Sequence, residues 1–158
     1  MKNLFLALAG CSALFLLTGC QSTARLDAAA RAQMLQEIAN EPPGNYFIGR
    51  RYYKTEYKFW GYVRKPGQPW SSAQMVMLNE NTRLAPDREA GKLGSDNGTE
   101  YKLLGYYSGD KVYEPASNGI YPEFVLTGYQ VQSPTPAPIF MNNAAALDPV
   151  RRVVLKPY

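Results

Sequence analysis

The sequence predicts a small all-β domain that follows a short N-terminal helix, and three observations predict it. Short segments rich in aromatic and β-branched residues recur from residue 46 onwards. Turn-rich segments separate them, and little of the chain shows the apolar spacing of a helix. Three strand-like segments contain a Gly-Tyr pair. A glycine within a strand indicates a sharp bend, a bulge or the close packing of another backbone, and a short sheet needs such bends in order to close into a barrel.

These features favour a strongly coiled barrel of the SH3-like or OB-like kind, and a two-sheet β-sandwich is the alternative. The Gly-Tyr pairs begin at Gly61, Gly105 and Gly128, and their unequal spacing argues against a repeat protein. Residues 46–158 are predicted to form a single domain. They show no family motif, so the fold prediction depends on the pattern alone.

The first residues have the organisation of an export signal. Lys2 precedes a mostly apolar run, residues 4–17, which is too short to span a bilayer. The run ends in the letters LTGC, of which the last is Cys20. A leucine three residues before a cysteine, with small residues between them, resembles the lipobox of bacterial lipoproteins. Residues 1–19 are therefore predicted to be a lipoprotein signal peptide.

The resemblance implies that cleavage occurs before Cys20 and that this cysteine carries lipid. Each buried methylene stabilises membrane attachment by about 0.8 kcal/mol, so two or three acyl chains anchor firmly. Gln21 stands where an aspartate would indicate retention in the inner membrane. The resemblance therefore implies attachment to the outer membrane, facing the periplasm, with the membrane as a partner through the lipid on Cys20.

Residues 20–45 are predicted to contain the lipid anchor, a spacer and a short helix. Leu26, Ala30, Met34 and Ile38 recur at four-residue steps, which is the spacing of one helix face. Two prolines after Glu41 end the helix, because the residue before a proline is disfavoured in the α conformation. We expect this helix to be a spacer or a docked lid, and a partner-binding helix is the alternative.

The β-domain is expected to contain short strands joined by turns. The predicted strands are residues 46–54, 58–64, 74–79, 100–108, 111–114 and 124–131. Residues 108–110 (SGD) are predicted to turn a hairpin. Residues 134–138 (PTPAP) favour a stiff polyproline arm or strap, and residues 150–155 are a candidate closing strand.

The composition excludes several classes of chemistry. The chain has no histidine, which removes histidine metal sites, Ser-His-Asp catalysis and an imidazole switch. It has two cysteines, of which Cys11 leaves with the signal and Cys20 is consumed by lipid, so no intramolecular disulfide is expected. Residues 94–98 (GSDNG) lack the alternating oxygen ligands of a calcium loop. The sequence therefore predicts neither a metal nor a cofactor.

The clearest candidate for binding is a row of aromatic and basic side chains. Alternation along residues 58–64 places Trp60, Tyr62 and Arg64 on one face, opposite the side that carries Val63. We expect this row to lie on the outer surface, joined by Tyr106 from another Gly-Tyr strand. Exposed rings stack on sugars, and an arginine binds carboxylate or phosphate. The alternative is that these rings belong to the core.

Two further classes of function receive less support. A carboxylate-based hydrolase would need two facing acids, for which Glu114 and Glu123 are the nearest candidates. A nucleic-acid interface would need a basic groove, but Arg50 and Arg51 point to opposite faces of one strand, and an exported protein meets little nucleic acid.

We therefore expect a non-catalytic envelope lipoprotein rather than an enzyme. Its binding domain would recognise cell-wall or other glycan through the surface aromatics. The alternative is a structural or assembly partner of an envelope protein complex, bound through the same rings or an exposed strand edge.

Overall fold

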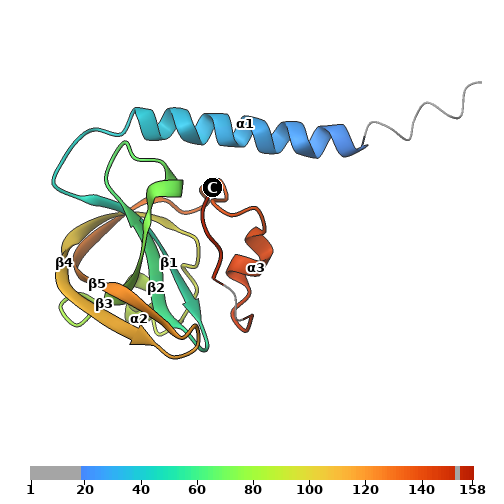
Figure 1. Cartoon of the computed structure of the whole chain (residues 1–158). Coiled ribbons are helices and arrows are strands. Elements are labelled where there is room, and N and C mark those ends of the chain that lie inside the picture. The colour runs from blue at the N-terminus through green and yellow to red at the C-terminus, as the bar shows by residue number, and fades with distance from the viewer. Residues whose placement is uncertain (1–18, 152–153) are drawn as a thin grey trace, which may run out of the picture.

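The computed structural model describes residues 19–151 and 154–158, with their side chains from Ala28 onwards. Five strands form a closed barrel in the order β1-β2-β3-β5-β4 (Figure 1). The strands are β1 (Phe47–Lys54), β2 (Lys58–Arg64), β3 (Gln74–Asn79), β4 (Glu100–Glu114) and β5 (Gly119–Ser133). The helices are α1 (Gly19–Ala39), the 3-10 helix η1 (Trp70–Ser72), α2 (Pro86–Glu89) and α3 (Asn143–Leu147). The predicted small barrel behind a helix is confirmed, and the alternative sandwich is not formed.

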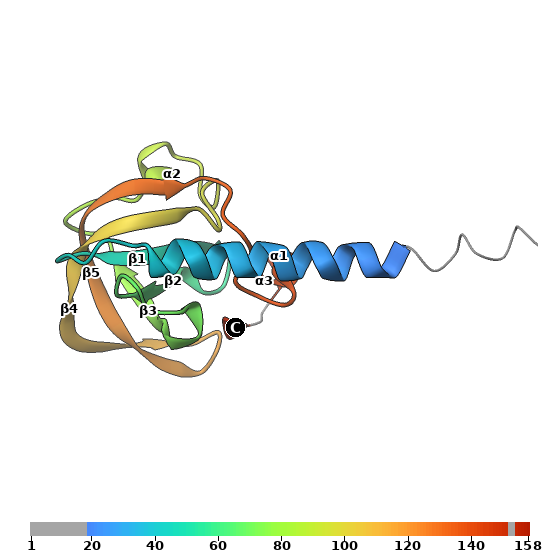
Figure 2. The same ribbon diagram turned by 90° about the horizontal axis from the view of Figure 1, so that it is seen from above.

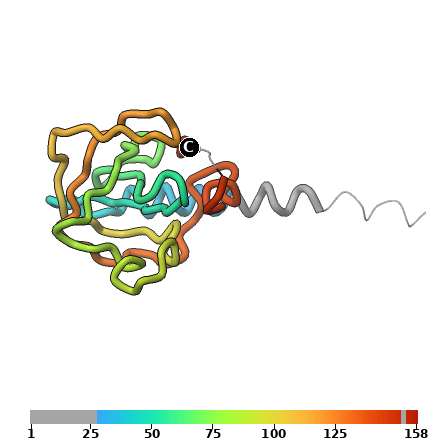
Figure 3. Tube along the Cα trace, turned by 90° about the horizontal axis from the view of Figure 1, so that it is seen from below, coloured from blue at the N-terminus to red at the C-terminus, as the bar shows by residue number. Residues whose placement is uncertain are grey.

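The long β4–β5 hairpin closes the barrel. Its strands have 15 residues each and curve around one side of the molecule (Figure 3). β4 pairs with β1 through residues 100–103, and β5 pairs in parallel with β3 through residues 123–125. Irregularities in the β4–β5 register bend both strands, as closure of a small sheet requires.

Two of the strand glycines allow a close approach of backbones, as their position within strands predicts. A Cβ atom on Gly61 would lie 2.6 Å from the carbonyl oxygen of Arg50 on the paired strand. A Cβ atom on Gly105 would clash with the carbonyl oxygen of Val125. Gly105 also adjoins a shift in the β4–β5 register, where the extra residue lies in β5. Any larger residue at either position would push two strands apart.

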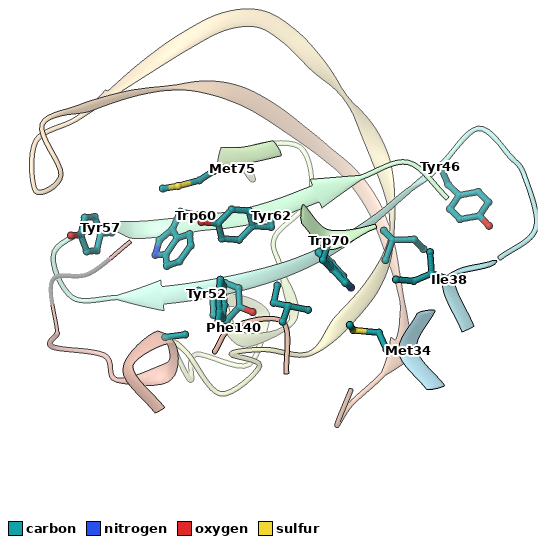
Figure 4. Packing of buried hydrophobic residues seen from close by; sticks show 13 residues of the cluster. Met34, Ile38, Tyr46, Tyr52, Tyr57, Trp60, Tyr62, Trp70, Met75 and Phe140 are labelled. Carbon is teal, nitrogen blue, oxygen red and sulfur yellow. The ribbon is translucent and has the colours of Figure 1, made fainter. Parts of the chain in front are cut away.

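Two groups of buried hydrophobic side chains lie on the two faces of the barrel wall. The barrel core consists of Phe47, Val63, Val76, Leu78, Ala85, Tyr101, Leu103, Phe124 and Leu126. The second group, which we call the outer cluster, is drawn in Figure 4 and consists of Met34, Ile38, Tyr46, Ile48, Tyr52, Tyr57, Trp60, Tyr62, Trp70, Met75, Ile139, Phe140 and Ala146. Neighbouring residues of β1 and β2 alternate between the two groups, so these strands are buried on both faces.

Segments from both ends of the chain cover the outer cluster. α1 runs across one side of the barrel and contributes Met34 and Ile38 (Figure 2). The segment after β5, which includes α3, contributes Ile139, Phe140 and Ala146. The two covers also meet, because the guanidinium carbon of Arg31 lies 4.2 Å from the ring centre of Tyr158. α1 is thus docked on the domain.

Two local predictions are wrong. Residues 108–110 do not turn a hairpin, because β4 continues to Glu114 and the turn lies at residues 115–118. The three residues form a bulge instead, with Gly109 at a φ of +93°, and pairing resumes between Lys111 and Pro122. No strand forms at residues 150, 151, 154 and 155, while residues 152–153 are outside the described structure. The barrel is already closed by β1 and β4, so this segment serves as a cover.

Candidate functional site

The predicted aromatic row is divided between a buried part and an exposed part. Trp60, Tyr62 and Arg64 lie on the face opposite Val63, as alternation predicts, but they are only 1%, 4% and 2% exposed. The prediction that these three residues are exposed is wrong, because α1 and the C-terminal segment cover this face. Tyr106 lies outside the outer cluster and is 55% exposed.

The buried rings of the outer cluster contact one another in a continuous series. Tyr52 stacks on Trp60 with ring centres 5.0 Å apart, and Trp60 meets Tyr62 edge to face at 5.8 Å. Phe140 from the C-terminal segment lies 5.7 Å from Tyr62. The Tyr62 hydroxyl donates a hydrogen bond to the carbonyl of Leu155, and burial raises the pKa of Tyr62 to about 12. These ring faces contact protein and are not available to a soluble glycan.

Arg64 fixes the end of α1 to the barrel. Its two terminal nitrogens each donate to the Glu41 carboxylate at 2.6 Å, and both side chains are almost fully buried. The ring of Trp70 lies 4.6 Å from the guanidinium carbon of Arg64 and 4.9 Å from that of Arg50. Arg50 in turn pairs with Glu100 at 2.8 Å. Arg50 and Arg64 are therefore committed to internal ion pairs, and Lys54 at the other end of β1 donates to the backbone carbonyls of Ala145, Asp148 and Arg151.

The exposed edge of β4 is the clearest open feature of the barrel. Beyond residue 103, the described pairings join β4 to β5 alone, so one edge of residues 104–114 carries backbone groups without a neighbouring strand. Such an edge is a template for an added strand. The bulge at residues 108–110 divides it into two short segments, which limits uncontrolled edge-to-edge association.

Apolar side chains accompany this edge. Half of the exposed large hydrophobic residues in the described structure lie on β4 and β5, and we call them the hairpin surface: Leu104, Tyr106, Tyr107, Tyr113, Ile120 and Val131. Tyr113 pairs directly with Ile120, and these two side chains are 57% and 65% exposed. Tyr107 is anchored by edge-to-face contacts with Phe47 and Phe124. Tyr106 and Tyr107 are consecutive residues and face opposite sides of β4, so exposed apolar groups lie on both faces of the hairpin beside the free edge. Strand addition at such an edge brings the alternate side chains of a partner against both faces.

The two acids considered for hydrolysis have local structural partners. Glu114 accepts hydrogen bonds from the backbone N–H groups of Ala116 and Ser117 at 2.8 and 2.6 Å, and so holds the hairpin turn. Glu123 accepts from the side-chain amide of Asn79 at 2.9 Å. None of the described contacts joins the two carboxylates, so they provide no facing pair.

Sequence reasoning missed a buried charge cluster at one end of the barrel. Arg51 contacts Glu80, Asp87 and Asp96 at 2.6, 2.9 and 2.5 Å, and all four residues are buried. Burial opposes the charge of Arg51, but the three carboxylates raise its pKa overall. The cluster ties the 80–99 loop to β1. The sequence could have indicated this cluster. Alternation places Arg51 on the same inward face of its strand as Phe47, and a buried arginine needs acidic partners, which recur in residues 80–99. Within the described residues, no group of three or more His, Cys, Asp or Glu is placed to hold a metal ion.

The comparisons with known proteins are negative. No family model matches the chain, and no curated protein or solved structure matches it. Cys20 is the second residue of α1, but its side chain and residues 1–18 are outside the described structure, so its lipidation stays a prediction. Among the described helices, none is both long and apolar enough to cross a membrane. The functional assignment therefore depends on the geometry of the domain.

Proposed function

We propose that this chain is a non-catalytic, lipid-anchored protein of the bacterial envelope that binds an envelope protein through the edge of β4. The observation that carries the proposal is the free edge of residues 104–114 beside the exposed hairpin surface. Binding would add an extended segment of the partner to β4. Its backbone would pair with the free edge, and its apolar side chains would contact Tyr106 and its neighbours.

The free edge of β4 and the exposed rings beside it would contribute differently to binding of the partner. Backbone pairing supplies affinity without sequence preference, and the side chains beside it supply specificity. Leu104–Tyr107 forms one four-residue stretch before the bulge, so we expect the partner to present a short extended segment rather than a long strand. Glycan binding through Trp60, Tyr62 and Arg64 is not part of this proposal, because those side chains are buried.

A photo-crosslinking experiment tests the surface. A photoreactive phenylalanine analogue replaces Tyr106 in the full-length protein, and irradiated envelopes are analysed for adducts. The matched control carries the same analogue at Leu93, which is similarly exposed at 52% but lies in the 80–99 loop. We expect a discrete protein adduct from position 106 only. Equal adducts from both positions, or none from position 106, would contradict the proposal.

A second variant tests the edge itself. Tyr106→Lys places a charge among the apolar groups, in the way that natural edge strands are protected from pairing. With the photoreactive analogue moved to Leu104, which lies in the same four-residue stretch as Tyr106, the substitution should remove the adduct while leaving the melting temperature unchanged. An adduct that persists would show that the partner does not depend on this part of the edge.

The lipid anchor has an independent test. Cys20→Ala should abolish incorporation of labelled fatty acid and leave the precursor with its signal peptide. Lipid labelling of this variant would place the anchor elsewhere. A non-lipidated precursor would support the anchor, whatever the outcome at Tyr106.

A further inference from the structure

Two lysines lie where β1 leaves the edge of β4. The last described pair between these strands joins Phe47 to Leu103, and β4 continues beyond it without β1. The ammonium nitrogen of Lys65 lies 3.7 Å from the centre of the Phe47 ring, and that of Lys102 lies 4.1 Å from the centre of the Tyr46 ring. Both positive charges are therefore held at the start of the free edge.

The two lysines lie on opposite faces of this edge. Lys102 shares the outer face of β4 with Tyr106, because every second residue of a strand points the same way. Lys65 contacts Phe47, a residue of the barrel core whose ring also meets Tyr107 edge to face at 5.8 Å. A strand added beside the first stretch of the free edge would therefore pass one lysine on each of its faces.

These ammonium groups have aromatic rings as neighbours in place of carboxylates. Lys65 is exposed and Lys102 is half-buried, and neither forms an ion pair within the described residues. Residues 104–107 carry no charge, and of the two acids further along the edge, Glu114 holds the turn and Asp110 lies in the bulge. The charge beside the start of the edge is thus positive and without an acidic partner.

Contact with a ring also prepares each lysine for an incoming carboxylate. The ring faces attract the ammonium groups and hold the apolar stems of the side chains in place. A side chain that is already ordered loses less conformational entropy when it forms an ion pair on binding. The start of the edge therefore favours a partner that is acidic at this point.

We propose that the partner segment which pairs with β4 carries acidic side chains at the end that lies beside Leu104. Consecutive acids would project to the two faces and meet Lys102 and Lys65. The rest of the segment would present apolar side chains to Tyr106 and Tyr107. This inference rests on the proposed function, because it names the chemistry of the segment that adds to the same edge.

The charges would fix the position of the segment along β4. Backbone pairing alone permits shifts along an edge, and the smallest shift that keeps the side chains on the same faces is two residues. Such a shift would move the acids about 7 Å from the lysines. Opposite charges would also speed the encounter of the segment with the edge.

The yield of photo-adduct measures the contribution of each lysine. The full-length protein carries the photoreactive analogue at Tyr106 and is expressed below saturation of the adduct. Lys65→Glu and Lys102→Glu reverse the charge on one face each and should each lower the yield about fivefold, as the loss of an accessible ion pair does. The arginine variants Lys65→Arg and Lys102→Arg keep the charge and should retain the adduct.

Two controls separate the local charge from other effects. Lys92→Glu makes the same reversal at an exposed position of the 80–99 loop and should leave the yield unchanged. Lys65→Met removes the charge while its apolar stem remains over the Phe47 ring, and it should lower the yield without lowering the melting temperature.

Mass spectrometry of the adduct then gives the sequence of the partner segment. We expect Asp or Glu within about three residues of the crosslinked position, because a strand advances about 3.3 Å per residue. A synthetic peptide of this segment should bind the full-length protein about fivefold more tightly than its counterpart with Asn and Gln in place of Asp and Glu.

The outcomes distinguish this inference from the proposed function. An adduct at Tyr106 that is equally strong with Lys65→Glu and Lys102→Glu overturns the acidic partner and leaves strand addition standing. An equal loss with Lys92→Glu would indicate attraction by net charge alone and also overturns it. Absence of the adduct from the protein with all its lysines overturns both proposals.

Discussion

The two outer faces of the barrel carry similar side chains in opposite surroundings. On the β1–β3 face, Tyr52, Trp60 and Tyr62 are almost completely buried, whereas Tyr106 and Tyr113 on the β4–β5 hairpin are more than half exposed. Tyr106, like the buried set, lies on the outside of the barrel wall, because its neighbours Gly105 and Tyr107 face Phe124 of the barrel core. The difference comes from the covers, because α1 and the C-terminal segment pack on the first face and leave the second one open.

This difference shows that residue type alone does not identify a binding surface in a small barrel. A small five-stranded barrel encloses few side chains, so a second layer of apolar burial adds to the stability of the domain. The outer cluster supplies that layer on one face. Among the described residues, nothing comparable covers the hairpin surface, which is why we propose partner binding there.

The largest expected effect is the loss of a ring from the covered face. Trp60→Ala should lower the free energy of unfolding by about 3–5 kcal/mol, because it removes a large buried side chain and leaves a cavity. Urea denaturation measures this value, with Trp60→Phe as a milder variant. A cost below about 1 kcal/mol would mean that the covers leave this face in solution.

Breaking the Arg64–Glu41 ion pair, which joins the segment after α1 to β2, should have the next largest effect on the free energy of unfolding. Arg64→Met leaves the buried carboxylate of Glu41 unpaired and should cost about 3 kcal/mol in the same assay. The control is Arg83→Met, which breaks an exposed pair with Glu89 at 3.3 Å and should cost less than about 1 kcal/mol. Equal costs for the two variants would show that the Arg64 pair is accessible to solvent.

Alkaline pH should destabilise the covered face. Burial raises the pKa of Tyr62 to about 12 and raises those of Tyr52 and Tyr101 further. The folded state then binds protons more tightly than the unfolded state, whose tyrosines have a pKa of about 10. Stability is therefore unaffected well below pH 10 and falls as the pH rises from 10 towards 12.

Tyr62→Phe removes one of these linked protons. The free energy of unfolding of this variant should therefore fall less between pH 7 and pH 12 than that of the wild-type protein. Urea denaturation at each pH, followed by near-ultraviolet circular dichroism, measures this fall. An unchanged dependence on pH would show that the Tyr62 hydroxyl is open to solvent in the folded protein.

The smallest effect on stability is expected on the open face. Tyr106→Ser should change the free energy of unfolding by no more than about 0.5 kcal/mol, since its ring is largely in solvent. Thermal and urea unfolding both measure this value. A loss of 2 kcal/mol or more would identify Tyr106 as a core residue and remove the reason for assigning binding to the hairpin surface.

Local pattern predicted much of the fold. Strands at residues 58–64 and 74–79 match β2 and β3, and close backbone contacts occur at Gly61 and Gly105, two of the three glycines of the Gly-Tyr pairs. Alternation also placed Trp60 and Val63 on opposite faces. The prediction failed at residues 108–110, where a turn signal became a bulge, because pairing with β5 continues on both sides of it.

The candidate site was less predictable, because exposure depends on contacts between distant parts of the chain. Met34 and Phe140 belong to one cluster although more than 100 residues separate them, and no local pattern reports such a contact. The salt bridge of Arg64 to Glu41 and the cluster around Arg51 have the same origin. Of the four predicted binding residues, Tyr106 alone is exposed.

By itself, the sequence determined the all-β character of the domain, the preceding helix and the absence of histidine chemistry, because these follow from residue type and short-range spacing. The tertiary structure alone decided which outer face is covered. A β-strand specifies two faces through alternation, but burial of either face requires a second element to pack there. Here α1 and the C-terminal segment pack on β1–β3, while β4 beyond residue 103 pairs with β5 alone.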